Sequence, residues 1–323
     1  MAGSGPTILI QGGGVSGLVT AVTLAEGGAR VTLSEAGPRI GSGASWYAGG
    51  MLAPWCEAEA APAEVTRDSL QSLSWWADHV PGVVRNGSLV VAPPRDQVEL
   101  SRFGRRTSHF ETLGSARIAE LEPDLEGRFD HALYFPEEGH VDPRCALSGL
   151  RERLLTLGGK IRLDSSVKDG SFDWVIDCTG LNARETETNL RGVRGEMILV
   201  RCPEVTLHRP VRMLHPRIPI YIVPRAQSVF MVGATMVESD DSREITVRAM
   251  SELLNALYTL HPAFAEAEII EANAGVRPSY PDNVPRVHRD GQRLSVNGMY
   301  RHGFLLSPAR AAEAAGIIFG DQA

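Results

Sequence analysis

The feature that most constrains this chain is a glycine-rich turn between a strand pattern and a helix pattern near the N-terminus. Residues 8–10 are apolar, and residues 15–22 carry apolar side chains at helical spacing. Between them, Gly12 permits the turn, Gly14 lets a pyrophosphate approach the backbone, and Gly17 lets the helix pack closely on the strand. The pattern predicts a dinucleotide site, with the phosphates on the unpaired N–H groups at the start of the helix.

An acidic residue supports this interpretation. Glu35 closes the next strand pattern about 20 residues further on, where a carboxylate can accept hydrogen bonds from a ribose 2′-hydroxyl. The acid favours an adenosine ribose without a 2′-phosphate. A glycine-rich turn in an ordinary βαβ unit is the alternative, and the turn alone does not distinguish NAD from FAD.

Length and composition narrow the class of protein. A chain of 323 residues is long enough for two domains, and a net charge of -7 predicts no binding of nucleic acid or of an anionic membrane. No apolar run is long enough to cross a bilayer and no signal peptide is recognisable, so we expect a cytoplasmic protein. The four cysteines form no CxxC pair and the histidines no HxxxH pair, which predicts neither a disulfide framework nor a metal site.

The stretch that follows Glu35 has the composition of a ligand lining. Residues 36–54 combine many glycines and small residues with aromatic ones, so a flat ligand could lie against the backbone. A flexible surface loop is the alternative, but Trp46, Met51 and Leu52 would be costly to leave in water.

The rest of the chain predicts a nucleotide domain that is interrupted and then resumed. Asp142-Pro143 opens a helix pattern that stops at Gly158-Gly159, and a buried strand pattern follows at residues 172–180. Residues 194–235 read as strands and turns, which favours an antiparallel sheet. A last glycine turn at residues 300–303 precedes an alanine-rich helix.

Several of these segments together resemble the D-amino-acid oxidase family of flavoproteins, and within it most closely the glycine oxidases of thiamine biosynthesis. The resemblance begins at the Gly12 turn and continues in order through residues 48–54, 177–180, 194–196, 221–225, 232–235, 275–278 and 300–303. It implies an α/β fold: a discontinuous, Rossmann-like FAD-binding domain and an α+β substrate domain with an antiparallel sheet. The expected FAD-binding segments are 1–50, 131–190 and 273–323, and the expected substrate domain comprises 51–130 and 191–272.

The resemblance also implies which residues contact FAD. They are Gly12, Gly14, Val15, Ser16, Gly17, Glu35, Ala36, Ser45, Gly49, Gly50, Met51, Val167, Thr179, Gly180, Arg301, His302, Gly303, Phe304 and Leu305. The backbone near Val167 would meet the adenine, and residues 49–51 and 301–303 would lie beside the isoalloxazine. No cysteine follows Cys202, so the final third offers no attachment point for a thioether-linked flavin, and we expect noncovalent FAD.

At the substrate end, the resemblance places Arg277 where a guanidinium grips the substrate carboxylate, and Tyr221 where an active-site tyrosine lies. Arg301 and Met51 complete this set. Each has a plainer alternative: Arg277 as a strand-end surface residue, Tyr221 as a packed aromatic, Arg301 as one half of an ion pair, and Met51 as core.

The expected activity is oxidation of glycine, and of other small amino acids, to the imine and glyoxylate, with molecular oxygen reduced to hydrogen peroxide. The imine would supply thiazole synthesis. The alternatives are an oxidase or dehydrogenase of D-amino or N-methylated amino acids, an NAD-dependent dehydrogenase, and a catalytically silent nucleotide-binding module. Assembly into a homo-oligomer is left open.

Overall fold

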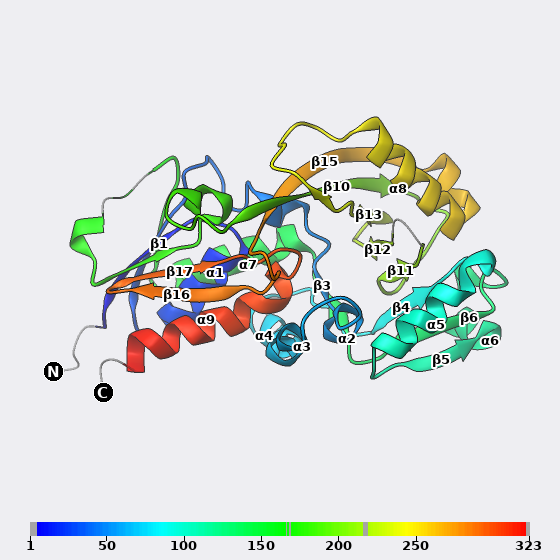
Figure 1. Ribbon diagram of the computed structural model, residues 1–323, viewed down its shortest axis with the longest axis horizontal. Coiled ribbons are helices and arrows are strands. Elements are labelled where there is room, and N and C mark those ends of the chain that lie inside the picture. Colours follow the sequence, from blue (N-terminus) through cyan, green and yellow to red (C-terminus); the bar gives the residue numbers. More distant parts are fainter. Residues whose placement is uncertain (1–4, 166, 168, 216–218, 321–323) are drawn as a thin grey trace.

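In the computed structural model, which describes residues 5–165, 167, 169–215 and 219–320, the chain builds two large β-sheets that lie beside each other (Figure 1). The smaller sheet has the strand order β16-β17-β9-β1-β2-β8. Its strands are β1 (Thr7–Gln11), β2 (Arg30–Ser34), β8 (Lys160–Arg162), β9 (Trp174–Asp177), β16 (Arg286–Asp290) and β17 (Arg293–Asn297).

The centre of the smaller sheet is parallel. β1 pairs in parallel with β2 and with β9, and the apolar residues Ile8, Leu9 and Ile10 are fully buried. A strand that is apolar at successive positions is expected where helices cover both faces of a parallel sheet. The helices α1 (Val15–Glu26), α7 (Pro143–Thr156) and α9 (Gly303–Gly320) share one hydrophobic core with this sheet.

The larger sheet is mostly antiparallel and has the order β14-β10-β13-β12-β11-β4-β6-β5, with β15 paired to β10. Its strands are β4 (Ser88–Val91), β5 (Glu111–Gly114), β6 (His131–Phe135), β10 (Arg191–Arg201), β11 (Val211–Met213), β12 (Ile220–Pro224), β13 (Val229–Gly233), β14 (Val237–Glu238) and β15 (Glu268–Ser279). Helix α8 (Val247–Leu260) packs on it through Leu253, Leu257 and Leu260. The sequence prediction of an antiparallel sheet here is confirmed.

Shorter elements complete the chain. The remaining helices are α2 (Pro54–Glu57), α3 (Ala63–Ser69), α4 (Ser72–His79), α5 (Gln97–Arg106) and α6 (Ser115–Leu121), and β3 (Met51–Leu52) pairs with β7 (Gly139–His140). The 3₁₀ turns are η1 (Ala44–Tyr47), η2 (Pro94–Asp96), η3 (Pro123–Leu125), η4 (Asp169–Ser171), η5 (Gly180–Glu185) and η6 (Pro262–Glu266).

The helix expected after Asp142 forms for the predicted reason. The Asp142 side chain accepts hydrogen bonds from the backbone N–H groups of Arg144 and Cys145, and Pro143 occupies the first turn. This cap satisfies donors that have no partner within the helix.

The expected domain boundaries differ from the structure at three places. β6 lies in the expected FAD-binding range 131–190, but it pairs with β4 and β5 in the larger sheet. β15 stays paired with β10 as far as Ser279, beyond the expected boundary at residue 273. α4 lies in the expected substrate range, but Trp76 is fully buried in the core of the smaller sheet and donates to the Phe304 carbonyl. Strand pairing and burial decided where these three elements lie. We therefore propose that β6 and the whole of β15 belong to the substrate domain and that α4 belongs to the FAD-binding domain.

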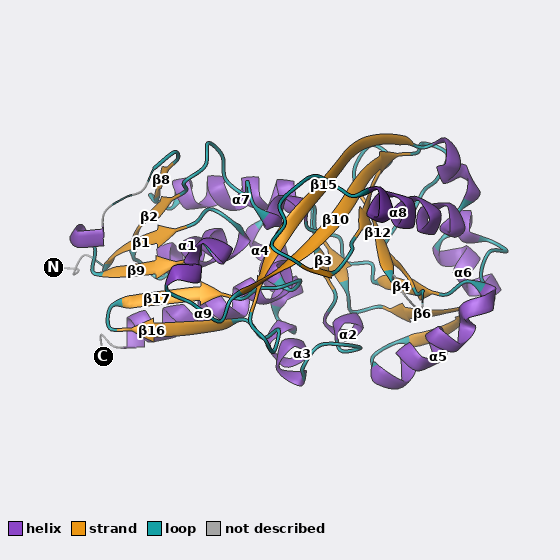
Figure 2. Ribbon diagram, turned by 45° about the horizontal axis from the view of Figure 1, so that its top comes forward, coloured by secondary structure: helices purple, strands orange, loops and turns teal. Residues whose placement is uncertain are grey.

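The two sheets are joined by a long strand pair. Figure 2 shows β10 and β15 reaching from beside β17 to the region of α8. At the near end, Ser279 forms an isolated bridge with Met299, which follows β17. Residues of β10 and β15 can therefore face a ligand that lies across the ends of the parallel strands.

Candidate active site

A cavity of about 630 Å³ lies between the two sheets. It is lined by the turn after β1, the segment after β2, the end of β9, the start of α9, and strands of the larger sheet. Ligands of open α/β sheets bind at the carboxyl ends of the parallel strands, and this cavity lies at the ends of β1, β2 and β9. The predicted residues that line the cavity are Gly12, Gly14, Val15, Ser16, Glu35, Ala36, Ser45, Gly49, Gly50, Met51, Val167, Thr179, Gly180, Tyr221, Arg277, Arg301, Gly303 and Phe304.

Three predicted residues are absent from this lining as the structure describes it. Gly17 faces the strand, where an added Cβ would lie 1.9 Å from the Gly12 carbonyl oxygen. His302 and Leu305 are 2% and 3% exposed and lie in the interior. The expected run 301–305 crosses the start of α9, and successive helical side chains point in different directions, so the run cannot face the cavity as a whole.

The glycine turn has the geometry that its sequence predicts. Gly12 has a φ of +102°, and an added Cβ would lie 2.5 Å from the Cys178 carbonyl oxygen. At Gly14, which lines the cavity, an added Cβ would meet the Ser45 hydroxyl at 3.2 Å. The Val15 N–H donates to that same hydroxyl at 3.0 Å. The start of α1 thus presents backbone to the cavity, which suits an anionic pyrophosphate.

The carboxylate of Glu35 reaches the cavity beside this turn. One oxygen accepts the Gly13 N–H at 2.7 Å, and the other accepts the Gly37 N–H at 2.9 Å. A carboxylate oxygen can accept more than one hydrogen bond, so both remain able to bind hydroxyl groups. Val167 lies in the same lining, while residues 166 and 168 lie outside the described residues.

The segment at Gly49 and Gly50 is packed closely from behind. Gly50 has a φ of +73°, and at Gly49 an added Cβ would lie 2.7 Å from the Tyr221 ring. The buried Arg225 donates to the Gly49 carbonyl at 2.7 Å and to the Val141 carbonyl at 3.0 Å. These contacts hold the glycine backbone at the wall, where a flat ring system could lie against it.

Arg277 reaches the far end of the cavity from β15. Its Nη1 donates to the Thr235 carbonyl at 3.2 Å, and its guanidinium lies against the backbone of Gly195. Burial lowers the pKa of Arg277 from its ordinary value, and the neighbouring Tyr221 opposes that shift. Among residues 5–320, leaving aside the undescribed positions 166, 168 and 216–218, no carboxylate forms an ion pair with Arg277.

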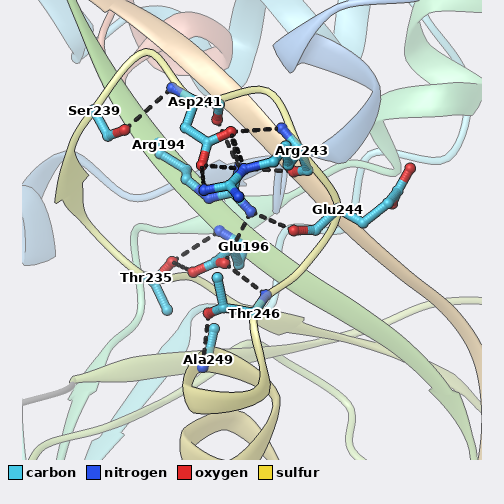
Figure 3. Close-up of polar contacts among 9 residues, drawn as sticks. All are labelled: Arg194, Glu196, Thr235, Ser239, Asp241, Arg243, Glu244, Thr246 and Ala249. Atoms are coloured by element: carbon cyan, nitrogen blue, oxygen red, sulfur yellow. Dashed lines mark hydrogen bonds and ion pairs between the residues drawn. The ribbon is translucent and has the colours of Figure 1, made fainter.

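The Thr235 carbonyl that holds Arg277 is itself fixed by a buried polar network (Figure 3). The Glu196 carboxylate accepts the Thr235 hydroxyl at 2.8 Å, the Thr246 N–H at 3.0 Å and Arg194 Nη2 at 3.0 Å. Burial acts against the charge of Glu196, but these hydrogen bonds outweigh it and lower its pKa. A fully bonded buried network is rigid, so it holds the support of Arg277 in one position.

The same network fastens the segment between β14 and α8. The Arg194 guanidinium donates to the backbone carbonyls of Asp241, Arg243 and Glu244, at 2.6, 2.7 and 2.6 Å. Arg194 and Glu196 belong to the motif at residues 194–196 on which the resemblance partly rested. The structure gives this motif a positioning role behind the cavity wall.

Sequence reasoning missed one charged residue of the cavity, Glu57 at the end of α2. Its Oε1 lies 2.8 Å from Arg301 Nη2, and its Oε2 lies 3.3 Å from His302 Nδ1. Burial acts to raise the pKa of Glu57, but the positive charge of Arg301 outweighs burial, and the pKa of Glu57 falls to about 2. Burial lowers the pKa of His302 to about 4, so its imidazole is neutral at pH 7. Glu57 and Arg301 are 244 residues apart, and no sequence spacing indicated their pairing.

Other kinds of site find little support in the described residues. They contain no group of three or more histidine, cysteine, aspartate or glutamate side chains that could hold a metal ion. Their four cysteines are free, and Cys56, Cys178 and Cys202 are buried. No described helix is both long enough and apolar enough to span a membrane.

Together, the glycine turn, the acid after β2 and a cavity that ends at arginine side chains define a dinucleotide-dependent oxidoreductase with two sheets. Comparison with known families identifies the group: the profile described as "DAO: FAD dependent oxidoreductase" matches residues 7–316. The chain belongs to this family and is an FAD-dependent enzyme. The glycines at which a Cβ would fill or crowd the cavity wall, Gly14 and Gly49, fit a large flat cofactor.

Individual relatives cover nearly the whole chain. A Rhizobium etli protein provisionally named thiamine biosynthesis oxidoreductase ThiO is 54% identical over 319 residues, which is 98% of this chain and 97% of that protein. Glycine oxidase of Pseudomonas aeruginosa is 28% identical, over 97% of this chain and 94% of its own. The crystal structure of glycine oxidase from Geobacillus kaustophilus has the same fold, with a TM-score of 0.83 at 23% identity, covering 98% of this chain and 95% of that one.

Proposed function

We propose that this protein oxidises glycine, and other small amino acids that fit the same cavity, to the imine, while molecular oxygen is reduced to hydrogen peroxide. The observation that carries the proposal is Arg277, a cation in the cavity wall for which the described residues supply no carboxylate partner. The names of the Pseudomonas aeruginosa and Rhizobium etli relatives support glycine as substrate and thiamine synthesis as the pathway. The imine would hydrolyse to glyoxylate and ammonia, or supply thiazole formation.

The residues at this end bind and orient the substrate. A planar guanidinium carries five N–H donors, and Arg277 uses one of its nitrogens on Thr235, so it can still grip both oxygens of a carboxylate. Two parallel hydrogen bonds fix the orientation of the substrate as well as its charge, and so direct one Cα–H bond towards the cofactor. Tyr221 lies beside Arg277, where it completes the wall and limits the access of water.

FAD bound in this cavity would supply the redox chemistry, so the protein itself needs no covalent bond to the substrate. Around Gly12, Gly14 and Glu35, the chain would hold the pyrophosphate and ribose, and Val167 would meet the adenine. The isoalloxazine end would be held at Gly49 to Met51 on one side and at Arg301 and Gly303 on the other, with noncovalent contacts throughout.

An absorbance scan of the purified protein, followed by anaerobic addition of glycine, tests the proposal. We expect a yellow protein whose flavin absorbance is bleached by glycine and restored by air. A colourless protein, or a flavin that glycine does not bleach, would contradict it. Oxygen uptake with glycine, sarcosine, D-alanine and D-proline then separates a glycine oxidase from an enzyme for N-methylated or D-amino acids.

The pathway needs a test of its own. Deletion of the gene from its host should create a growth requirement that thiamine or its thiazole precursor relieves. If growth without thiamine is unaffected, the oxidase serves another purpose.

A further inference from the structure

Two arginines line the substrate end of the cavity, and their charges are compensated differently. Arg301 Nη2 lies 2.8 Å from Glu57 Oε1. Arg277 donates to the Thr235 carbonyl, and the part of the chain that the structure describes brings no carboxylate into an ion pair with it. One guanidinium is therefore paired and the other is available to a ligand.

Glu57 is held beside Arg301 by its surroundings. Its side chain is 15% exposed, and Arg212 Nη1 approaches the same carboxylate oxygen at 3.7 Å. Burial acts to raise the pKa of Glu57, but Arg301 and its other cationic neighbours lower it to about 2. Glu57 is therefore ionised throughout the neutral range and presents a fixed negative charge in the cavity wall.

We propose that Glu57 determines which substrate charge the enzyme accepts. By pairing with Arg301 it leaves Arg277 as the one arginine of the described cavity lining without a carboxylate partner, so amino acids with one carboxylate bind and those with a second carboxylate are rejected. This inference rests on the proposed function, because it assigns the substrate carboxylate to Arg277.

The physical basis is repulsion between like charges in a partly buried site. A second carboxylate near Arg301 would meet the carboxylate of Glu57, and two close anions in a poorly hydrated cavity repel each other strongly. Specificity of this kind comes from an unfavourable contact with the wrong ligand rather than from a better contact with the right one. Removing the charge of Glu57 should expose Arg301 to a second carboxylate.

The test compares the holoenzyme with the Glu57→Gln variant, which keeps the shape of the side chain and removes its charge. Isothermal titration gives the affinities for acetate, malonate and succinate, three ligands that need no turnover. We expect the affinity for malonate or succinate relative to acetate to rise at least tenfold in Glu57→Gln. Oxygen uptake adds a second comparison, iminodiacetate against sarcosine, which are both N-substituted glycines but differ by one carboxylate.

Two controls identify the charges responsible. Glu59 pairs with Arg212 at 3.4 Å and with Arg106 at 2.9 Å and is absent from the described cavity lining, so Glu59→Gln should leave the ratio of affinities as in wild type. In the Glu57→Gln background, Arg301→Gln should remove the gain in dicarboxylate affinity.

Several results would overturn the proposal. Tighter binding of malonate or succinate than of acetate by the wild-type enzyme would refute the proposal. This comparison needs no variant, so it decides the matter if Glu57→Gln fails to fold. An unchanged ratio in Glu57→Gln, or an equal shift in Glu59→Gln, would also refute it. If Glu57→Gln weakens glycine relative to acetate at an unchanged ratio, Glu57 receives the amino group instead. Normal ligand ratios without glycine turnover would contradict the proposed function but not the role of Glu57.

Discussion

Substitution of Arg277 by methionine separates ligand binding from protein stability. Methionine keeps much of the length and apolar stem of arginine but removes the guanidinium. A hydrogen bond to a charged group contributes about 1.5–3 kcal/mol, so loss of two such bonds to the substrate carboxylate costs at least about 3 kcal/mol. At a factor of ten per 1.4 kcal/mol, the KM for glycine should rise on the order of 10²-fold.

Loss of a paired buried charge usually destabilises a protein, but we expect no such loss of stability in Arg277→Met. Burial disfavours the charge of Arg277, and its hydrogen bond to Thr235 is long, at 3.2 Å. We therefore expect Arg277→Met without ligand to unfold at a temperature no lower than wild type. Binding sites often sacrifice stability in this way, because a group held ready for a ligand lacks a partner until the ligand arrives.

Arg209→Met is the matched contrast. Arg209 Nε donates at 2.7 Å to Glu122, whose side chain is fully buried, and Arg209 is not among the residues that line the described cavity. Removing one partner of a buried ion pair costs about 3–5 kcal/mol, so this variant should unfold at a much lower temperature with an unchanged KM. Oxygen uptake over a range of glycine concentrations and thermal unfolding provide both measurements. Wild-type glycine affinity in Arg277→Met, or a loss of stability equal to that of Arg209→Met, would refute the reasoning.

Two further predictions concern the cofactor turn and the interior. Gly17→Ala places a Cβ 1.9 Å from the Gly12 carbonyl oxygen, so this variant should purify with much less flavin by absorbance. Gly316→Ala is the control, because Gly316 is also helical, is absent from the described cavity lining, and an added Cβ there meets nothing within 4 Å; it should retain the flavin. Equal flavin content in the two variants would contradict the packing role of Gly17. Burial raises the pKa of Glu138 to about 7, so the folded state holds this proton more tightly than the unfolded state does. The resulting stabilisation of the folded state is fully present below about pH 4.5 and is lost as the pH rises through 7. Glu138→Gln should remove up to about 3 kcal/mol of that decline, measured by denaturant unfolding at pH 5 and pH 8; an identical pH dependence in the variant would show that Glu138 is not its source.

The parts of the site that could be predicted from sequence are those whose chemistry is local. The turn at Gly12, the capped helix after Asp142 and the acid at Glu35 each depend on neighbouring residues and on backbone conformation. Periodicity also separated the parallel sheet from the antiparallel one. The family resemblance added Arg277 and Tyr221, which the cavity brings together with Arg301 and Met51.

Domain boundaries and charge pairing required the tertiary structure. The pattern of β6 is that of any strand, and only its pairing with β4 and β5 assigns it to the larger sheet. Likewise, nothing around Glu57 or Arg301 in the chain indicates that one neutralises the other, because an ion pair depends on distance in space. The sequence by itself predicted a dinucleotide site at the first turn, since local backbone geometry is enough for that prediction. Only the folded chain decided which of the two cavity arginines is paired with Glu57, because that depends on a carboxylate brought from a distant helix.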